Sequence, residues 1–205
     1  LLHRQAEIRP CRLAAQLDYT KGALYRYFPS KDALIAALQV SSLARVHNRF
    51  EDSWAHAGRS LGPLDERANS LAMILLTTRL YGRLEAELPA DFALIRLAVG
   101  DPRHLLSNQE VSAVMEQMLV LINAVAALIC RAVKSGALRE GDSTQRAVLL
   151  WASAHGNVLT GKFSRYNKDL FDTQRLIESL TRNLLSGWGA LNEDIVAATN
   201  SIKGL

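Results

Sequence analysis

The stretch TKGALYRYFPSKDAL, residues 20–34, concentrates side chains that hydrogen-bond to anions. It holds two lysines, an arginine, two tyrosines and a threonine, next to a glycine and small alanines. Such side chains donate hydrogen bonds to the phosphate oxygens of nucleic acids, and they position a protein on the duplex. The chemistry that this stretch suits is therefore non-covalent binding of an anion such as a phosphate group.

The rest of the sequence lacks the residue groupings that enzymes use. No nucleophile–base pair, paired carboxylates or glycine-rich phosphate loop stands out, and the five histidines share no spacing. The two cysteines, Cys11 and Cys130, are far apart and belong to no metal-binding cluster. We therefore predict no enzymatic activity, no cofactor and no metal. So few cysteines also favour a reducing, cytoplasmic compartment.

The excess positive charge is confined to the start of the chain. Residues 1–31 contain six Lys or Arg and two Asp or Glu, a net charge of +4, which equals the net charge of all 205 residues. A local basic patch indicates an anionic partner, either nucleic acid or a membrane surface. The alternative interpretation is a chance fluctuation in a short window.

Apolar residues recur with helical spacing almost throughout, so we predict an all-α fold. The tail, EDIVAATNSIKGL, is expected to be short and frayed. The most apolar stretch, residues 118–130, is too short to span a bilayer, so we expect a buried helix and no membrane partner. The expected helices cover residues 11–17, 20–28, 30–56, 65–85, 89–100, 108–134, 142–161 and 172–191.

The two shortest helices form a module of their own, because short helices with little apolar area must pack on each other. Leu13, Ala14 and Leu17 share one face of the first, while Leu24 and Phe28 share one face of the second. Two short helices joined by a turn predict a helix-turn-helix, whose second helix enters the major groove of DNA.

The second short helix carries residues suited to that groove. Gly22 and Ala23 let the backbone approach the groove floor, and tyrosine hydroxyls on either side reach phosphates. Tyr25 has an alternative role, packing against the following long helix. The long helix begins at Lys31, where free N–H groups and a full positive charge suit a phosphate. The candidate DNA contacts are Cys11, Thr20, Lys21, Gly22, Ala23, Tyr25, Tyr27 and Lys31.

The segment LAAQLDYTKGALYRYFPSKDALIAAL resembles the DNA-binding signature of the TetR family of bacterial repressors. The matching positions are Leu13-Ala14, Gly22-Ala23-Leu24-Tyr25, Tyr27-Phe28 and Ser30-Lys31-Asp32-Ala33-Leu34. The resemblance implies a helix-turn-helix domain over residues 1–40, and a ligand-binding and dimerisation domain over residues 41–205.

The segment departs from the family pattern at three positions. Asp18 and Tyr19 stand where the family has a turn glycine and a valine, and Pro10 replaces a small hydroxyl residue. The family's first helix would end near residues 1–3, so most of that helix is missing from this sequence.

The last two long helices are predicted to form a two-fold dimer interface. Apolar residues recur every four positions on the helix at 172–191, over a face wider than one neighbouring helix needs. The alternative is that this row belongs to the core of one chain. The residues assigned to the interface are His155, Leu176, Leu180, Leu184 and Trp188.

An effector pocket is expected inside the larger domain. Methionine and aromatic side chains suit adaptable apolar sites, which favours a small apolar or aromatic ligand. Asn123 is singled out because an amide in an apolar helix needs a hydrogen-bond partner. Each of these residues could equally be ordinary core. The candidate lining residues are Met73, Tyr81, Met115, Met118, Asn123, Trp151 and Asn157.

The leading hypothesis is a homodimeric transcriptional repressor that a small-molecule inducer releases from a near-palindromic operator. Two alternatives stay open: an all-α enzyme, and a helical interaction protein whose basic start is incidental. Strongly salt-dependent DNA binding would separate the repressor from both.

Overall fold

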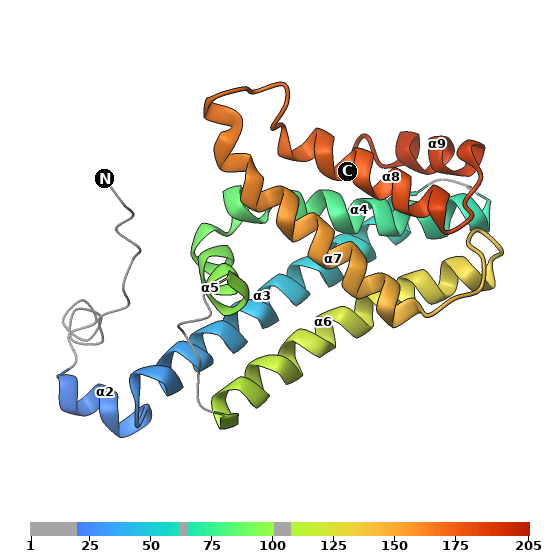
Figure 1. Ribbon diagram of the computed structural model, residues 1–205. Helices are drawn as coiled ribbons and strands as arrows, with labels where there is room; N and C mark the ends of the chain where they lie inside the picture. The colour runs from blue at the N-terminus through green and yellow to red at the C-terminus, as the bar shows by residue number, and fades with distance from the viewer. Residues whose placement is uncertain (1–19, 62–64, 101–107) are drawn as a thin grey trace.

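The computed structural model describes residues 20–61, 65–100 and 108–205, and all secondary structure in these ranges is helical (Figure 1). The predicted all-α fold is confirmed. The expected helix at 11–17 lies outside the described residues. The helices are α2 (Lys21–Tyr27), α3 (Lys31–Ser60), α4 (Glu66–Glu87), α5 (Pro89–Gly100), α6 (Asn108–Lys134), α7 (Ser143–Thr160), the short 3₁₀ helix η1 (Gly161–Arg165), α8 (Thr173–Gly187) and α9 (Asn192–Ser201).

Side-chain caps set where the long helices begin. Ser30 Oγ accepts a hydrogen bond from the Ala33 N–H at 2.9 Å, at the start of α3. Asp142 and Asp172 cap α7 and α8 in the same way, accepting from backbone N–H groups of the first turn. A cap satisfies an N–H that has no partner inside the helix, so these short-range contacts confirm the predicted starts.

The C-terminal segment differs from the prediction. α8 ends at Gly187, and the backbone then turns at Gly189, whose φ is 102°. The tail is not frayed, because it forms α9 and buries Ile195, Ala198 and Ile202. These residues follow helical spacing, and they give α9 an apolar face that packs on α4.

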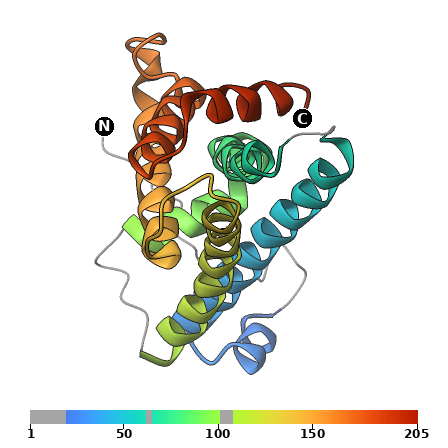
Figure 2. The same cartoon turned by 90° about the vertical axis from the view of Figure 1, so that its right-hand side faces the viewer.

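α4 is the central helix of the bundle. Figure 2 shows it nearly end-on, surrounded by the other long helices. Its residues 70–78 are all buried, which a helix that is apolar on every side requires. The polar side chains Thr77 and Thr78 donate to backbone carbonyls of the preceding turn, so their burial leaves no hydroxyl unsatisfied.

α6 is only partly buried, contrary to the prediction of a buried helix. Leu121, Ile122 and Ile129 belong to the core, and Asn123 is exposed, so its amide needs no partner inside the chain. By length and composition alone, residues 110–134 of α6 could cross a membrane, a longer segment than the apolar stretch 118–130 on which the prediction was based. That observation is weak support for a membrane span, because a core helix passes the same test.

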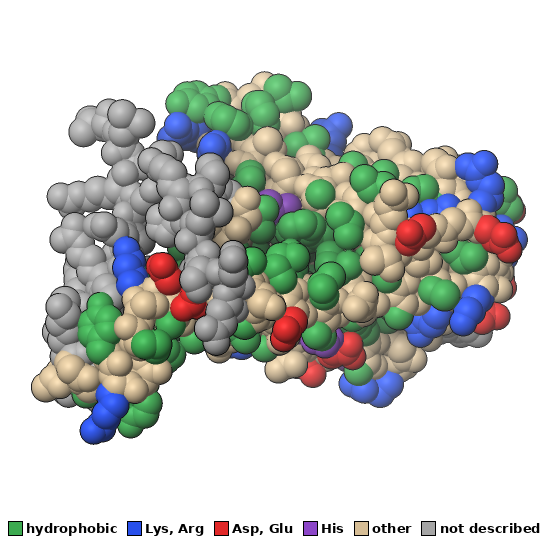
Figure 3. All heavy atoms as spheres, turned by 60° about the horizontal axis from the view of Figure 1, so that its bottom comes forward, with side chains coloured by type: hydrophobic (Ala, Val, Ile, Leu, Met, Phe, Trp, Pro, Cys, Tyr) green, Lys and Arg blue, Asp and Glu red, His purple; other side chains and the backbone are tan. Residues whose placement is uncertain are grey.

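The outer face of α6 is apolar. Figure 3 turns the lower side of Figure 1, where α6 lies, toward the viewer. Hydrophobic side chains gather over the middle of this face. Four large apolar side chains are 39–47% exposed there, namely Val111, Met115, Leu119 and Val120.

Candidate nucleic-acid interface and core cavity

α2 is a helix of two turns at one end of the molecule (Figure 1). Thr20 Oγ1 accepts a hydrogen bond from the Ala23 N–H at 3.1 Å, which makes Thr20 the N-cap of this helix. Three residues then connect α2 to the start of α3. α2 is therefore carried by α3, and any shift of α3 moves it.

Two tyrosines of α2 are exposed. Tyr25 is 36% exposed and Tyr27 is 68% exposed, and the Arg26 guanidinium lies 5.8 Å from the centre of the Tyr27 ring. An aromatic ring exposed on so short a helix contributes little to the protein's own core. The exposed hydroxyl of Tyr27 is instead available to a phosphate oxygen.

Among the described residues, nothing requires glycine at position 22. A Cβ built on it would lie 4.0 Å from Thr20 Oγ1, an ordinary van der Waals contact. Gly22 is exposed and Ala23 half-buried, so these two positions present little side-chain volume. The surface allows another molecule to approach the α2 backbone closely.

The start of α3 adds a positive site beside α2. Lys31 occupies the first turn of α3 and is half-buried, and Ser30 caps the helix. Helix N-termini carry partial positive charge and attract phosphate groups. Thr20, Gly22 and Ala23 thus lie with the exposed tyrosines and Lys31 at one end of the molecule, and their contact with DNA stays a prediction. Cys11 and the side chain of Lys21 lie outside the described residues.

A polar cluster fixes α3 against α5. The Asp91 carboxylate, at the start of α5, accepts hydrogen bonds from Ser42 Oγ at 2.8 Å and from Arg45 Nε at 3.0 Å. Burial alone would raise the pKa of Asp91, but the hydrogen bonds from Arg45 and Ser42 outweigh burial and lower it. The carboxylate is therefore charged, and it holds α3 beside α5. Sequence reasoning missed this cluster, because no motif marks residues 42, 45 and 91.

A small apolar cavity lies between α3, α4, α6 and α7. The volume of the cavity, taken as the space open to the centre of a water-sized sphere, is ≈ 30 Å³. Pockets for drug-sized ligands measure roughly 300–1,000 Å³, so this cavity is too small to hold such a ligand as it stands. Its lining residues are Phe50, Thr77, Thr78, Tyr81, Leu121, Ile122, Val125, Leu150, Trp151 and Ala154.

Only two of the predicted pocket residues, Tyr81 and Trp151, line this cavity. Met73 is buried and Met118 half-buried elsewhere in the core, while Met115 joins Asn123 on the exposed side of α6. The Asn157 amide donates to the Ser153 carbonyl at 2.9 Å, so it serves its own helix. Most other lining residues are aliphatic core residues that no sequence pattern sets apart.

His155 lies in the core of one chain, where it cannot contact a second copy. Its side chain is 3% exposed, and its Nδ1 lies 2.7 Å from the Tyr81 hydroxyl. Burial lowers the pKa of His155, and the positive charge of Arg96 lowers it further. The prediction that His155 lies in a dimer interface is therefore wrong. Adjacent residues of a helix point in different directions, so the side chain of His155 points into the core although Gly156 beside it is exposed.

The predicted interface row on α8 is half-buried. Leu184 and Trp188 pack against the core, and the Arg146 guanidinium lies 5.4 Å from the centre of the Trp188 rings. Leu176 and Leu180 are also half-buried, which leaves part of each side chain for a partner.

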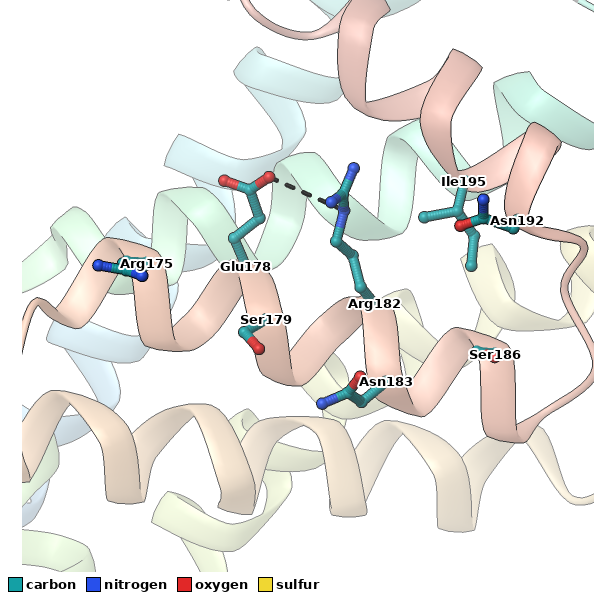
Figure 4. Close-up of a pocket in the computed structure, with 8 residues that line it drawn as sticks. All are labelled: Arg175, Glu178, Ser179, Arg182, Asn183, Ser186, Asn192 and Ile195. Carbon is teal, nitrogen blue, oxygen red and sulfur yellow. Dashed lines mark ion pairs between the residues drawn. The ribbon is translucent and has the colours of Figure 1, made fainter. Parts of the chain in front are cut away.

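The side of α8 that faces α9 forms a polar groove of ≈ 490 Å³ (Figure 4). Arg182 and Glu178 face each other across one helical turn, with Nε 3.8 Å from the carboxylate. The lining carries two arginines, Arg175 and Arg182, against the single carboxylate of Glu178, so the groove has a small positive excess.

Comparisons with known proteins agree with this geometry. Residues 12–38 match the model of the family described as bacterial regulatory proteins, tetR family. The predicted resemblance is thereby confirmed at the residues that carry it. No curated protein matches the chain in sequence.

Two solved structures share the fold over most of the chain. One is a protein of unknown function from Rhodococcus sp. RHA1, with a TM-score of 0.61 and 15% identity, covering 90% of this chain and 86% of that one. The other is a transcriptional regulator of the TetR family from Agrobacterium tumefaciens, with a TM-score of 0.60 and 17% identity, covering 89% and 87%. At these identities the likeness concerns the fold alone.

Proposed function

We infer that this chain is a DNA-binding transcriptional regulator of the TetR family. The observation that carries the inference is the position of α2. A two-turn helix with exposed tyrosines projects at one end of α3, and it lies within the residues that match the family. We propose a division near residue 40, with the DNA-binding domain before it and the ligand-binding domain over residues 41–205.

A DNA-binding assay tests this inference directly. The full-length protein is titrated onto the DNA that flanks its own gene at two salt concentrations. A double variant, Tyr27→Ala with Lys31→Ala, is measured beside it. We expect tight binding to one near-palindromic segment, weakened at least about tenfold in the variant and by added salt. Lys134→Ala, which removes an exposed charge at the far end of α6, is the matched control and should bind normally.

Salt-independent binding, or equal binding by the wild type and the double variant, would contradict the DNA-binding function. An all-α enzyme or a helical interaction protein would then remain as the alternatives. The all-α enzyme does not explain the two exposed tyrosines on α2, and salt-dependent DNA binding separates the regulator from an interaction protein.

We further propose that the regulator is a homodimer formed by α7 and α8. The interface would use Val148 and Leu149 on α7, which are exposed, and Leu176 and Leu180 on α8, which are half-buried. An isologous dimer of helix pairs forms a four-helix bundle. Two-fold symmetry would place two copies of α2 on successive turns of DNA, which predicts a near-palindromic operator.

The core cavity is the proposed effector site. Its hydroxyl groups already have partners: Thr77 Oγ1 accepts from Trp54 Nε1 at 2.8 Å, and Thr78 Oγ1 accepts from Thr181 Oγ1 at 3.0 Å. Such a lining favours a compact apolar or aromatic molecule. Because the cavity is so small, a ligand must displace its walls, and one wall is Phe50 of α3. Displacing α3 would change the spacing of the two α2 helices and oppose DNA binding.

A cavity-filling substitution tests the effector site. Ala154→Leu adds bulk at the lining, so it should abolish the release of DNA by a small aromatic compound while DNA binding itself persists. Val196→Leu, on the exposed side of α9, is the control. Release of DNA that is unchanged in Ala154→Leu would place the effector elsewhere.

A further inference from the structure

The segment that joins α7 to α8 protrudes from the bundle (Figures 1 and 2). We call residues 161–171 the arm. Its base is closed, because a Cβ on Gly161 would lie 2.5 Å from Thr173 Oγ1. Its interior is packed, since the rings of Phe163 and Phe171 lie 5.5 Å apart. The arm is therefore held in one conformation by its own contacts, and its outer side chains form a defined surface.

The outer surface of the arm is apolar and basic. Three large apolar side chains stand within eight residues, and each is exposed: Phe163 by 38%, Tyr166 by 72% and Leu170 by 59%. Single exposed apolar residues are normal, but several together on one projection mark an interaction surface. Lys162, Arg165 and Lys168 are interspersed among them, and none forms an ion pair with a carboxylate of the described residues.

α7 offers a complementary surface near its start. Val148 is 42% exposed and Leu149 is 48% exposed, one turn after the helix begins. In the middle of α7 the exposed residues Ala152 and Gly156 are small. Nothing lies within 4 Å of a Cβ built on Gly156, so the chain itself does not require glycine there. A second helix could cross closely at this point.

We propose that the arm of one copy seats on the start of α7 of a second copy. A two-fold axis near Gly156 reverses the direction of α7. Phe163 follows Gly156 by seven residues and Leu149 precedes it by seven, about 10 Å in each direction at the helical rise. The reversal therefore brings the arm of each copy over Val148 and Leu149 of the other.

Charge complementarity supports a second copy as the occupant. Glu140 and Asp142 are exposed just before α7, next to the apolar pair. The reversal places them near the basic side chains of the opposite arm. Within one chain the same groups are separated by the length of α7, about 27 Å for its 18 residues, so they cannot pair there.

The inference rests on the proposed homodimer and assigns its contacts, so the test measures dimer affinity. The full-length protein is diluted in analytical ultracentrifugation, beside an arm variant that carries Phe163→Ser, Tyr166→Ser and Leu170→Ser. We expect the dissociation constant of the arm variant to rise at least tenfold, since truncating a buried aromatic anchor costs that or more. Val196→Ser, 40% exposed on α9, should dimerise like the wild type.

Mixing variants shows whether the contact crosses between copies. Leu149→Ser should also weaken dimerisation, and it leaves the arm intact. A mixture of the arm variant with Leu149→Ser restores one arm contact per heterodimer, so heterodimers should outnumber both homodimers. Normal helix content by circular dichroism at 222 nm shows that each variant is folded.

Each other outcome overturns the inference in a distinguishable way. A dimeric wild type with an equally dimeric arm variant removes the arm contact and leaves the homodimer standing. A monomeric wild type at all concentrations removes both. Co-sedimentation of the wild type, but not of the arm variant, with phosphatidylglycerol vesicles at unchanged dimer affinity would assign the arm to an anionic membrane instead.

Discussion

Tyr81 and His155 join α4 to α7 through one buried hydrogen bond. His155 is surrounded by aromatic rings, with ring centres 5.8 Å away at Phe92 and 5.9 Å away at Trp151. Its Nε2 is buried and has no hydrogen-bond partner in the described part of the chain. Burial also raises the pKa of Tyr81, so both side chains of the pair are neutral near pH 7.

Removing the Tyr81 hydroxyl should destabilise the protein. Tyr81→Phe removes the hydrogen-bond partner of His155 Nδ1, so that nitrogen is left unpaired in the core. An unpaired buried polar group costs about 1–3 kcal/mol in the free energy of unfolding. Urea denaturation measures the loss. Tyr166→Phe is the matched control, because that hydroxyl is on a residue 72% exposed, and its effect should be within about 0.5 kcal/mol. Equal effects of the two substitutions would refute the role of the buried pair.

His155 also predicts how stability depends on pH. The pKa of His155 is lower in the folded protein than in the unfolded chain, where it is about 6.5. The folded state therefore favours neutral His155, and this stability is fully present above pH 6.5 and is lost as the pH falls below it. His155→Gln keeps a hydrogen-bonding group but does not titrate. We expect the free energy of unfolding to fall between pH 7 and pH 5.5 more steeply in the wild type than in His155→Gln. Parallel curves would contradict the assignment.

At the scale of elements, local chemistry was readable from the sequence and packing was not. The helix starts near residues 30, 142 and 172 could be predicted, because a helix start depends on a cap that bonds residues two or three positions away. The exposure of α6 and the inward direction of His155 depend on helices distant in sequence. The candidate DNA contacts on α2 could be proposed from the sequence because they belong to a short contiguous motif, and the described residues Gly22, Tyr25 and Tyr27 are exposed.

The contact of α3 with α5 connects the core cavity to α3, the helix that carries α2. Phe92 is next to Asp91 in α5, and its ring lies 6.3 Å from Tyr81, a cavity-lining residue. Asp91 in turn holds Ser42 and Arg45 of α3. A change in the cavity can therefore reach α3 through neighbouring side chains, which makes this joint a hypothesis for the coupling path.

Asp91→Asn should weaken that joint. It removes the charge that Arg45 and Ser42 bond, and hydrogen bonds to charged groups contribute about 1.5–3 kcal/mol. We expect a loss of that size in the free energy of unfolding, and a smaller change in DNA affinity when an aromatic effector is added. Glu85→Gln is the control, since its pair with Arg96 at 3.6 Å is about half exposed on both sides and contributes at most about 1 kcal/mol. A loss no larger than that of Glu85→Gln would contradict the proposed joint.

At the scale of the whole molecule, the excess positive charge and the projecting α2 helix belong to the same N-terminal part of the chain. The net positive charge of the chain is accounted for by residues 1–31, and α2 and the start of α3 lie at one end of the molecule. The larger bundle carries balanced charge, so it has no electrostatic reason to bind DNA. A two-fold dimer would direct two basic ends toward the same duplex.

The salt dependence of DNA binding shows how many copies of the basic end contact one DNA duplex. The logarithm of the binding constant falls with the logarithm of salt concentration, with a slope of about −0.9 per phosphate neutralised. If Lys31 of each copy neutralises one phosphate in a two-fold complex, Lys31→Ala should reduce the slope by about two, whereas one bound chain would lose about one. Fluorescence anisotropy with one operator at several salt concentrations measures the slopes. Lys134→Ala should leave the slope unchanged, because α6 ends far from α2. An unchanged slope for Lys31→Ala would remove Lys31 from the DNA contacts, and a decrease of one would argue against two-fold binding.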